Sequence, residues 1–176
     1  MGKLTSHRSQ QPPAGPAPVL VALGSNRCHG RYGRPPAVLR AAVKALEKGG
    51  LKVRQVSPIL ETAPLGPSNR RYANGALLAR WSGSPRALLA LLKRTEADFG
   101  RRRSRRWAAR VLDCDLIAFG QAIVREPGLT VPHPALHQRL FVLQPLLAVW
   151  PDWRHPQLNL SVRHMAARLA HPHPVD

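Results

Sequence analysis

The sequence predicts one domain in which helices pack on a β-sheet, an α/β or α+β sandwich. Short apolar segments typical of buried strands alternate along the chain with longer segments that have helical spacing. The length of 176 residues fits a single domain. Hydrophobic residues make up 44% and charged residues 20% of the chain, so the composition favours a folded core over disorder.

The first predicted strand runs from Val19 to Leu23, and the turn-favouring residues 24–26 end it. A helix is expected to begin at Pro35-Pro36, because a first helical turn does not need the backbone N–H that proline lacks. The pair Gly49-Gly50 ends this helix, and apolar residues between 51 and 56 indicate a second strand.

The middle of the domain contains a third strand, a helix and a fourth strand. Alternating apolar side chains predict the third strand from about Tyr72 to Trp81. Ser84 before Pro85 is a strong helix start, because serine caps free N–H groups, and Gly100 closes that helix. Bulky apolar residues then predict a strand between Val111 and Phe119.

The C-terminal third is predicted to be mainly loop and helix. Prolines indicate a loop over residues 129–138, and helices are expected over 141–148 and 161–169. The proline-rich segment 1–18 and the segment 171–176 are expected to be flexible tails, so that residues 19–170 form the single domain.

Charge and composition narrow the class of partner. The chain has 27 Lys and Arg residues against nine Asp and Glu, a formal charge of +18, which favours polyanions such as nucleic acid, phosphates or nucleotides. Its two cysteines lack C-x-x-C spacing, so we expect no zinc or redox site and a cytoplasmic location. No apolar run approaches the roughly 20 residues of a membrane-spanning helix, so no membrane contact is expected.

Two acids on one predicted strand form the most informative motif. Side chains two residues apart share a strand face, so Asp113 and Asp115 point one way while Leu112, Cys114 and Leu116 point into the opposite layer. Two like charges about 7 Å apart are unfavourable unless a cation neutralises them, and hard divalent ions prefer carboxylate oxygens. The motif therefore predicts a Mg²⁺ site, although an exposed acid pair bridged to arginines is the simpler alternative.

The surroundings of the acid pair favour a metal nucleotide. Six arginines, at positions 101, 102, 103, 105, 106 and 110, precede the pair. Carboxylates for Mg²⁺ beside guanidinium groups for phosphate oxygens are what phosphoryl transfer requires. By itself the arginine run also fits a solvated loop or an RNA-binding stretch, but only Trp107 lies beside it as a stacking aromatic, and no Walker-type loop occurs in the chain.

Six sequence blocks follow one another along the chain: Ala22-Leu23-Gly24-Ser25-Asn26, Glu61 to Pro67, Tyr72-Ala73-Asn74, Glu96 with Gly100-Arg101, Arg106 to Asp115, and Thr130 to Pro134 with Arg139 and Phe141-Val142-Leu143. In this order they give the sequence a strong resemblance to 6-hydroxymethyl-7,8-dihydropterin pyrophosphokinases, the folate-pathway enzymes that move pyrophosphate from ATP to a pterin alcohol. The resemblance covers roughly residues 19–156 and departs from the family at Ala63, Ala108, Ala109 and Cys114.

The resemblance implies a role for each matched residue. Asp113 and Asp115 would hold two Mg²⁺ ions on the phosphates of ATP, with Arg101, Arg103 and Arg110 as the catalytic arginines. The implied pterin-binding residues are Thr62, Leu65, Tyr72, Asn74, Trp107 and Phe141; the implied ATP-binding residues are Glu96, Arg110, Thr130, His133 and Arg139. Because the arginine loop is one residue short, Arg102 could take the role of Arg103.

The resemblance also implies the fold and the partners. It implies an α+β, ferredoxin-like sandwich with a mainly antiparallel sheet and helices on its faces. It implies an ATP-dependent diphosphotransferase that acts as a monomer in folate biosynthesis, without a nucleic-acid partner. A basic RNA-binding protein and a phosphate-sensing domain with a degenerate site are the competing classes.

Overall fold

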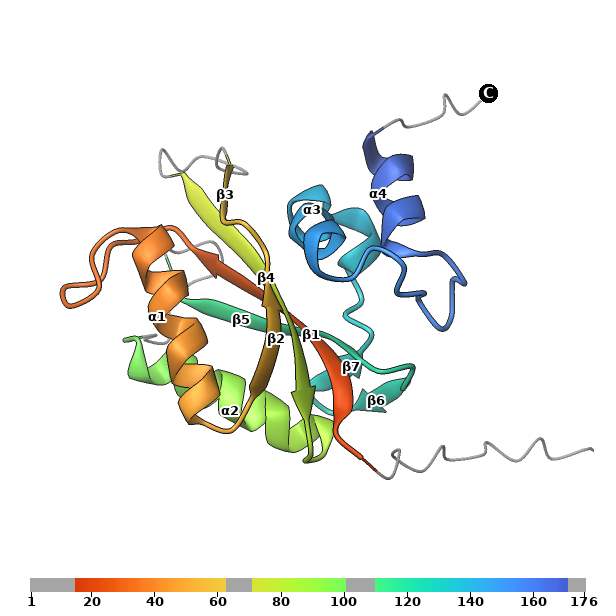
Figure 1. Ribbon diagram of the computed structural model, residues 1–176, viewed down its shortest axis with the longest axis horizontal. Coiled ribbons are helices and arrows are strands. Elements are labelled where there is room, and N and C mark those ends of the chain that lie inside the picture. Colours follow the sequence, from red (N-terminus) through yellow and green to blue (C-terminus); the bar gives the residue numbers. More distant parts are fainter. Residues whose placement is uncertain (1–14, 63–70, 101–109, 171–176) are drawn as a thin grey trace, which may run out of the picture.

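The computed structural model describes residues 15–62, 71–100 and 110–170, which form one α+β domain (Figure 1). Its strands are β1 (Ala17–Ser25), β2 (Lys52–Val56), β3 (Leu60–Thr62), β4 (Tyr72–Trp81), β5 (Asp113–Phe119), β6 (Val124–Glu126) and β7 (Leu129–Val131). Its helices are α1 (Pro35–Lys48), α2 (Pro85–Asp98), α3 (Leu140–Val149) and α4 (Val162–Ala170), with a 3₁₀ turn η1 (Leu136–Gln138).

The main sheet is antiparallel and has the strand order β2-β4-β1-β5, with β3 pairing onto the end of β4. Leaving β3 aside, the chain runs β1-α1-β2-β4-α2-β5, which gives this strand order its ferredoxin-like character. The predicted α+β sandwich is thereby confirmed. Strands β6 and β7 form a separate hairpin beside the edge strand β5.

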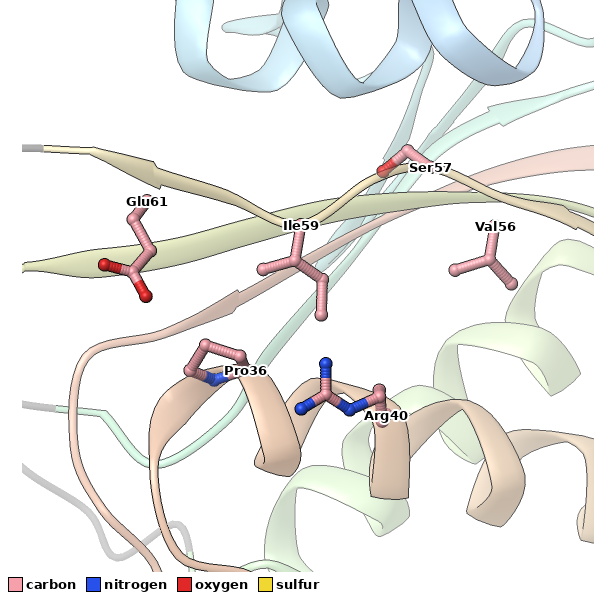
Figure 2. Close-up of a pocket in the computed structure, with 6 residues that line it drawn as sticks. All are labelled: Pro36, Arg40, Val56, Ser57, Ile59 and Glu61. Carbon is pink, nitrogen blue, oxygen red and sulfur yellow. The ribbon is translucent and has the colours of Figure 1, made fainter.

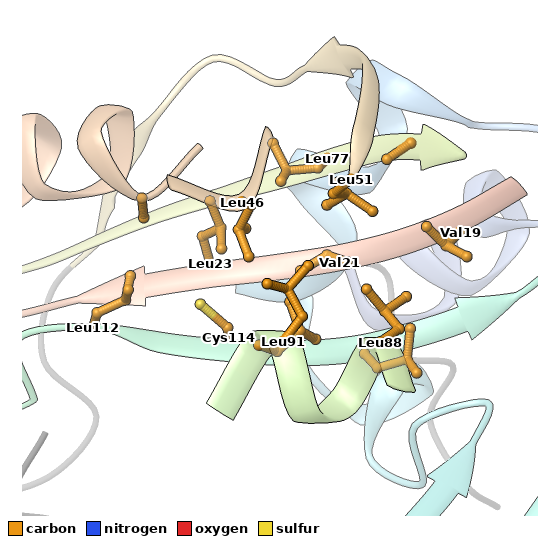
Figure 3. Packing of buried hydrophobic residues seen from close by; sticks show 14 of the residues in the cluster. Val19, Val21, Leu23, Leu46, Leu51, Leu77, Leu88, Leu91, Leu112 and Cys114 are labelled. Carbon is orange, nitrogen blue, oxygen red and sulfur yellow. The ribbon is translucent and has the colours of Figure 1, made fainter. Parts of the chain in front are cut away.

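Each face of the sheet is covered by its own pair of helices. Helices α1 and α2 lie on one face and α3 and α4 on the other (Figure 1). Figure 3 shows the first of these layers, where Leu91 of α2 packs with Val21, Leu23 and Cys114. On the second face, side chains such as Leu20 and Ile117 pack against Leu143 of α3.

The local chemistry of α2 and α3 accounts for where these helices lie. Ser84 caps α2, because its Oγ accepts a hydrogen bond from the Ala87 N–H at 3.1 Å. Helix α3 is apolar nearly throughout and carries Pro145 in its interior. Burial of Leu143 and Leu146 against the sheet outweighs the unfavourable proline, so this helix depends on tertiary packing.

The observed elements differ from the predicted ones in several places. Strand β5 begins at Asp113 rather than at Val111, and β3 and β6 are additional strands. Residues 129–131 form β7 and residues 136–138 form η1, so the prediction of loop throughout 129–138 is wrong there. Pairing of Leu129 and Thr130 with β6 makes this strand, a contact that its own three residues do not encode. Strand β1 begins at Ala17, inside the expected tail, because a proline such as Pro18 is tolerated near a strand start.

A bulge in β5 separates the acid pair from the more buried end of the strand. Leu20 pairs with Ala118 whereas Val21 pairs with Leu116, which leaves Ile117 as the extra residue. Before the bulge, the half-buried Asp113 and Asp115 alternate with buried neighbours. The predicted separation of the two acids from Leu112, Cys114 and Leu116 is confirmed.

Candidate active site

The acid pair lies on the sheet face that also carries α3 and α4. Asp115 pairs with Ala22 and Asp113 with Gly24 on the neighbouring strand β1, and Ala22 packs with the second core layer. The side chain of Asp113 is 26% exposed, so solvent reaches the carboxylate. Both acids are therefore accessible to a ligand on this face.

Gly24 joins the acid pair to the residues predicted to bind a heterocycle. It pairs with Asp113 on one side and with Asn74 of β4 on the other. A Cβ atom at position 24 would lie 3.8 Å from Oδ1 of Asn74 and 3.9 Å from Cβ of Asp113. The amide and the acid thus flank a strip of bare backbone, which we call the Gly24 strip, and Tyr72 shares its face two residues along β4.

The orientation of the Asn74 amide is fixed by Thr62. Nδ2 of Asn74 donates to Oγ1 of Thr62 at 2.9 Å, across the pairing of β3 with β4. Asn74 is buried, and its bond to Thr62 leaves Oδ1 beside the Gly24 strip. The structure therefore brings together Thr62, Asn74 and Asp113.

Arg110 forms an ion pair with the first acid. Its Nη1 donates to Oδ2 of Asp113 at 2.7 Å, and its backbone N–H donates to Oδ1 of Asn26 at 2.7 Å. Burial alone would lower the pKa of Arg110, but the attraction of Asp113, with smaller contributions from Asp115 and Glu96, raises it. Arg110 is thus held next to the acids as a permanent cation.

His133 lies at the free edge of β5. Its backbone N–H donates to the Ile117 carbonyl at 2.9 Å, and its Nδ1 accepts from the Ala135 N–H at 3.2 Å. Burial lowers the pKa of His133, and the attraction of Asp115 opposes this shift only in part. The neutral ring therefore carries its proton on Nε2, which is left as a donor.

The remaining predicted residues lie on β7, on α3 and at the residue that precedes α3. Thr130 is exposed on β7, Arg139 lies directly before α3, and Phe141 is half-buried in the first turn of α3. Among the described residues, no ring contact joins Tyr72 to Phe141. Four predicted residues, Leu65, Arg101, Arg103 and Trp107, lie outside the described residues, as does Arg102.

Glu96 lies on the α2 side of β5. It is 1% exposed, and its Oε1 accepts from the Cys114 N–H at 2.7 Å and from Nζ of Lys93 at 3.1 Å. Sequence reasoning did not find Lys93 or the contribution of Asn26 to the site. Asn26 could have been found, because it ends one of the blocks that carry the resemblance.

Two surface hollows lie near this region. One of about 540 Å³ is lined by Asn26, Arg27, Cys28, Arg34, Pro35, Pro36, Glu61, Arg71, Tyr72 and Ala73. The other, of about 500 Å³, lies between α1 and the β2–β3 segment, where Figure 2 shows Pro36 and Arg40 facing Ile59 and Glu61. Neither hollow is lined by Asp113 or Asp115. Asn26 and Tyr72 connect the first hollow with the site, whereas the second hollow shares no lining residue with it.

The donor set fits a metal that arrives with its ligand. Within residues 15–62, 71–100 and 110–170, no group of three or more His, Cys, Asp and Glu side chains could hold a metal. Two accessible carboxylates on one strand face, beside a cation for phosphate, suit Mg²⁺ whose other ligands are phosphate and water oxygens. In the described part of the chain, no helix is long and apolar enough to span a membrane.

Comparison with known proteins identifies the family. The model of the 7,8-dihydro-6-hydroxymethylpterin-pyrophosphokinase (HPPK) family matches residues 20–151. The 2-amino-4-hydroxy-6-hydroxymethyldihydropteridine pyrophosphokinase of Pseudomonas aeruginosa is 37% identical over 154 residues, covering 86% of this chain and 90% of that protein. The enzyme of the same name from Synechocystis is 36% identical over 154 residues, covering 83% of this chain and 79% of its own.

Solved structures agree with this at the level of the fold. Wild-type Plasmodium falciparum HPPK-DHPS superposes with a TM-score of 0.66 at 12% identity, over 87% of this chain and 44% of that one. This chain therefore spans less than half the length of that structure's chain. From the family match and the sequence identities, we conclude that the chain belongs to the 7,8-dihydro-6-hydroxymethylpterin-pyrophosphokinase family.

Proposed function

We propose that this chain transfers pyrophosphate from ATP to 6-hydroxymethyl-7,8-dihydropterin, giving the pterin diphosphate and AMP in folate biosynthesis. The names of its relatives support this reaction. The structural observation that carries it is the row Asn74, Gly24 and Asp113, which sets an amide that can recognise a ring edge beside an acid that can hold a metal phosphate.

The pterin binds on the Asn74 side of the Gly24 strip. The amide of Asn74, held by Thr62, offers the ring a fixed acceptor. Tyr72 and Phe141 enclose the flat ring, since aromatic faces hold heterocycles well. Leu65 and Trp107 complete the pocket in this proposal, and a site that hydrogen-bonds ring nitrogens rejects analogues lacking them.

The nucleotide binds on the Asp113 side. Asp113 and Asp115 hold two Mg²⁺ ions that, when bound, neutralise the charge on the phosphates and orient them. Arg110 lies close enough to exchange its bond to Asp113 for one to a phosphate oxygen. Arg101 and Arg103, or Arg102 in place of the latter, supply further guanidinium groups.

Three residues form the other wall of the nucleotide site. The nucleotide accepts hydrogen bonds from Nε2–H of His133, from Arg139 and from the hydroxyl of Thr130. Because the site positions both substrates, the reaction needs no covalent intermediate with the protein. Glu96 contributes to the nucleotide site from the α2 side of β5, where its Oε1 accepts a hydrogen bond from the Cys114 N–H. The hydroxymethyl oxygen attacks the β-phosphorus in line, the bond from that phosphorus to the oxygen of the α-phosphate breaks, and AMP leaves while the alcohol loses its proton.

The same site chemistry sets the expected partners. We propose that the protein acts as a cytoplasmic monomer and that its basic charge serves nucleotide phosphates rather than nucleic acid or membrane. A basic RNA-binding protein would instead lose affinity for RNA steeply with salt and would be indifferent to Mg-ATP.

An AMP-release assay tests this function. We expect AMP to form only when ATP, Mg²⁺ and the reduced pterin alcohol are all present. The matched control replaces the hydroxymethyl pterin by its 6-methyl analogue, which can occupy the ring site but has no hydroxyl to attack phosphorus. A rate of AMP release that does not depend on the pterin would contradict the proposal. Salt-sensitive RNA binding without turnover would contradict it as well.

A further inference from the structure

The edge strand β5 carries a hydrogen-bonding arrangement that the reaction itself does not require. Among the residues that the structure describes, the sheet ends at β5, and no further strand pairs with the backbone groups on its outer side. The Cys114 peptide groups are bonded there by side chains of α2. The Cys114 N–H donates to Oε1 of Glu96 at 2.7 Å, and Nζ of Lys93 lies 3.5 Å from the Cys114 carbonyl oxygen.

The two α2 side chains are also bonded to each other. Nζ of Lys93 donates to Oε1 of Glu96 at 3.1 Å, one turn apart along the helix. Glu96 is 1% exposed, and a carboxylate so deeply buried is costly unless it is paired. Lys93 and the Cys114 peptide provide that pairing, so the three groups stabilise one another.

Cys114 is the residue between the two acids. Its own side chain is fully buried in the layer beneath α1 and α2. Burial, reinforced by the nearby Glu96 charge, raises the pKa of its thiol well above the usual range, so Cys114 serves as an apolar side chain there. Core packing and the two α2 side chains therefore hold Cys114 from two directions.

We propose that Glu96 is a positioning residue: with Lys93 it holds the Cys114 peptide at the free edge of β5 and so fixes the direction of the flanking Asp113 and Asp115 carboxylates. The identity of the ligand that these acids hold rests on the proposed function. The positioning role does not, because it is inferred from the contacts of Glu96. This role differs from a direct contact with the nucleotide, which would depend on the negative charge of Glu96.

Two variants separate the roles. Glu96→Gln keeps an oxygen that can accept from the Cys114 N–H and removes the charge, whereas Glu96→Leu removes the acceptor at similar volume. Thr95→Val is the matched control, since Thr95 is also buried on α2 and its hydroxyl donates to the Leu91 carbonyl of the same helix at 3.0 Å.

The first readout is amide hydrogen exchange in the ligand-free protein. We expect Glu96→Leu to speed exchange at Cys114 by at least about tenfold relative to amides in the middle of β1, because the buried N–H loses its partner. Glu96→Gln and Thr95→Val should leave this ratio near the wild-type value. Unchanged Cys114 protection in Glu96→Leu would overturn the proposal, whether or not the chain has the proposed activity.

The second readout is the Mg²⁺ concentration that half-saturates AMP release. Residues that orient metal ligands typically change metal affinity by about 10- to 100-fold, so Glu96→Leu should raise this concentration by that factor and Glu96→Gln should restore it. Equal loss in both variants, together with weaker metal-free nucleotide binding, would assign Glu96 a direct contact and overturn the positioning role. If Glu96→Leu does not fold, Lys93→Met, which removes the second donor, should still speed Cys114 exchange, and an unchanged rate would overturn the proposal.

Discussion

Nη1 of Arg110 lies 2.7 Å from Oδ2 of Asp113, so one of the two acids is already neutralised by a guanidinium group. The backbone of Arg110 is anchored as well, through two hydrogen bonds with Asn26. The side chain can therefore change partner while its backbone stays in place. When a metal phosphate binds, the carboxylate of Asp113 would bind the metal and the guanidinium of Arg110 would bind the phosphate.

Replacing Arg110 by alanine should slow the reaction without weakening metal binding. Removal of one positioned donor to a developing charge costs about 10²- to 10³-fold in kcat. The Mg²⁺ requirement of AMP release should stay the same or fall, because a competing cation is gone from Asp113. Arg163→Ala is the control, since it removes only an exposed ion pair to Asp152. A normal kcat with a raised Mg²⁺ requirement would argue against partner exchange.

A methyl group on the Gly24 strip should block the site while leaving the fold intact. The two nearest atoms to a Cβ at Gly24 lie at 3.8 and 3.9 Å, ordinary van der Waals distances, so Gly24→Ala meets no clash within the protein. We expect a free energy of unfolding equal to or above wild type, and a loss of about 100-fold in kcat/KM because a small displacement of substrate is costly.

Gly75→Ala is the matched control for Gly24→Ala. Gly75 follows Asn74 on β4, and its added Cβ would lie 3.7 Å from Oγ of Ser57 and 3.8 Å from Cδ1 of Leu39, on the opposite face. Both variants should be equally stable in thermal unfolding, but only Gly24→Ala should lose activity. Equal activity of Gly24→Ala and Gly75→Ala would show that the substrate does not bind against the Gly24 strip.

Thr62→Val should weaken pterin binding selectively. The substitution removes the acceptor for Nδ2 of Asn74, which frees the amide to rotate. The loss of a buried partner costs about 1–3 kcal/mol, so calorimetry should show pterin affinity at least about tenfold weaker with Mg-ATP affinity unchanged. Ser57→Ala is the control. It removes the acceptor for the N–H of Ala76, which lies on β4 as Asn74 does, and it should lower stability without changing pterin affinity. Equal pterin affinity in wild type and Thr62→Val would contradict the proposed orientation of Asn74.

His155 should make stability depend on pH. Burial, assisted by His137, lowers the pKa of His155, whose Nδ1 accepts from the N–H groups of Gln157 and Leu158. The unfolded state binds a proton near the ordinary pKa of about 6.5, before the folded state does, so protonation favours unfolding. The stabilisation is fully present above about pH 6.5 and is lost as pH falls through the lowered folded pKa.

The measurement is thermal unfolding between pH 7.5 and pH 5. The Tm of wild type should fall with acidification, and His155→Asn, which offers an amide oxygen in place of Nδ1, should reduce the fall. An unchanged pH dependence in this variant would remove His155 as its source.

The placement of the acids could be predicted from the sequence because it depends on local periodicity. Asp113 and Asp115 share a face for the simple reason that strand side chains alternate. The helix that Ser84 caps could also be predicted from the sequence, because the capping serine and the proline of the first turn are adjacent. Each of these features is encoded within a few consecutive residues.

Other features arise only when distant segments meet. Strands such as β3 and β7 have three residues each, too few for a periodic pattern, and form by pairing with β4 and β6. The alignment of Asn74 with Gly24 depends on the register of β1 against β4. The bond from the Cys114 N–H to Glu96 joins residues 18 positions apart and left no local signal.

The most direct test is AMP release by Asp113→Asn and Asp115→Asn, measured together with pterin affinity. Each variant keeps the size of the side chain and removes the charge that a divalent cation requires. We predict that turnover falls by at least about 10³-fold in both, as for loss of a principal electrostatic group, while pterin affinity changes less than about threefold, which is under 1 kcal/mol. Turnover near the wild-type rate in either variant would contradict a reaction built on this pair of acids.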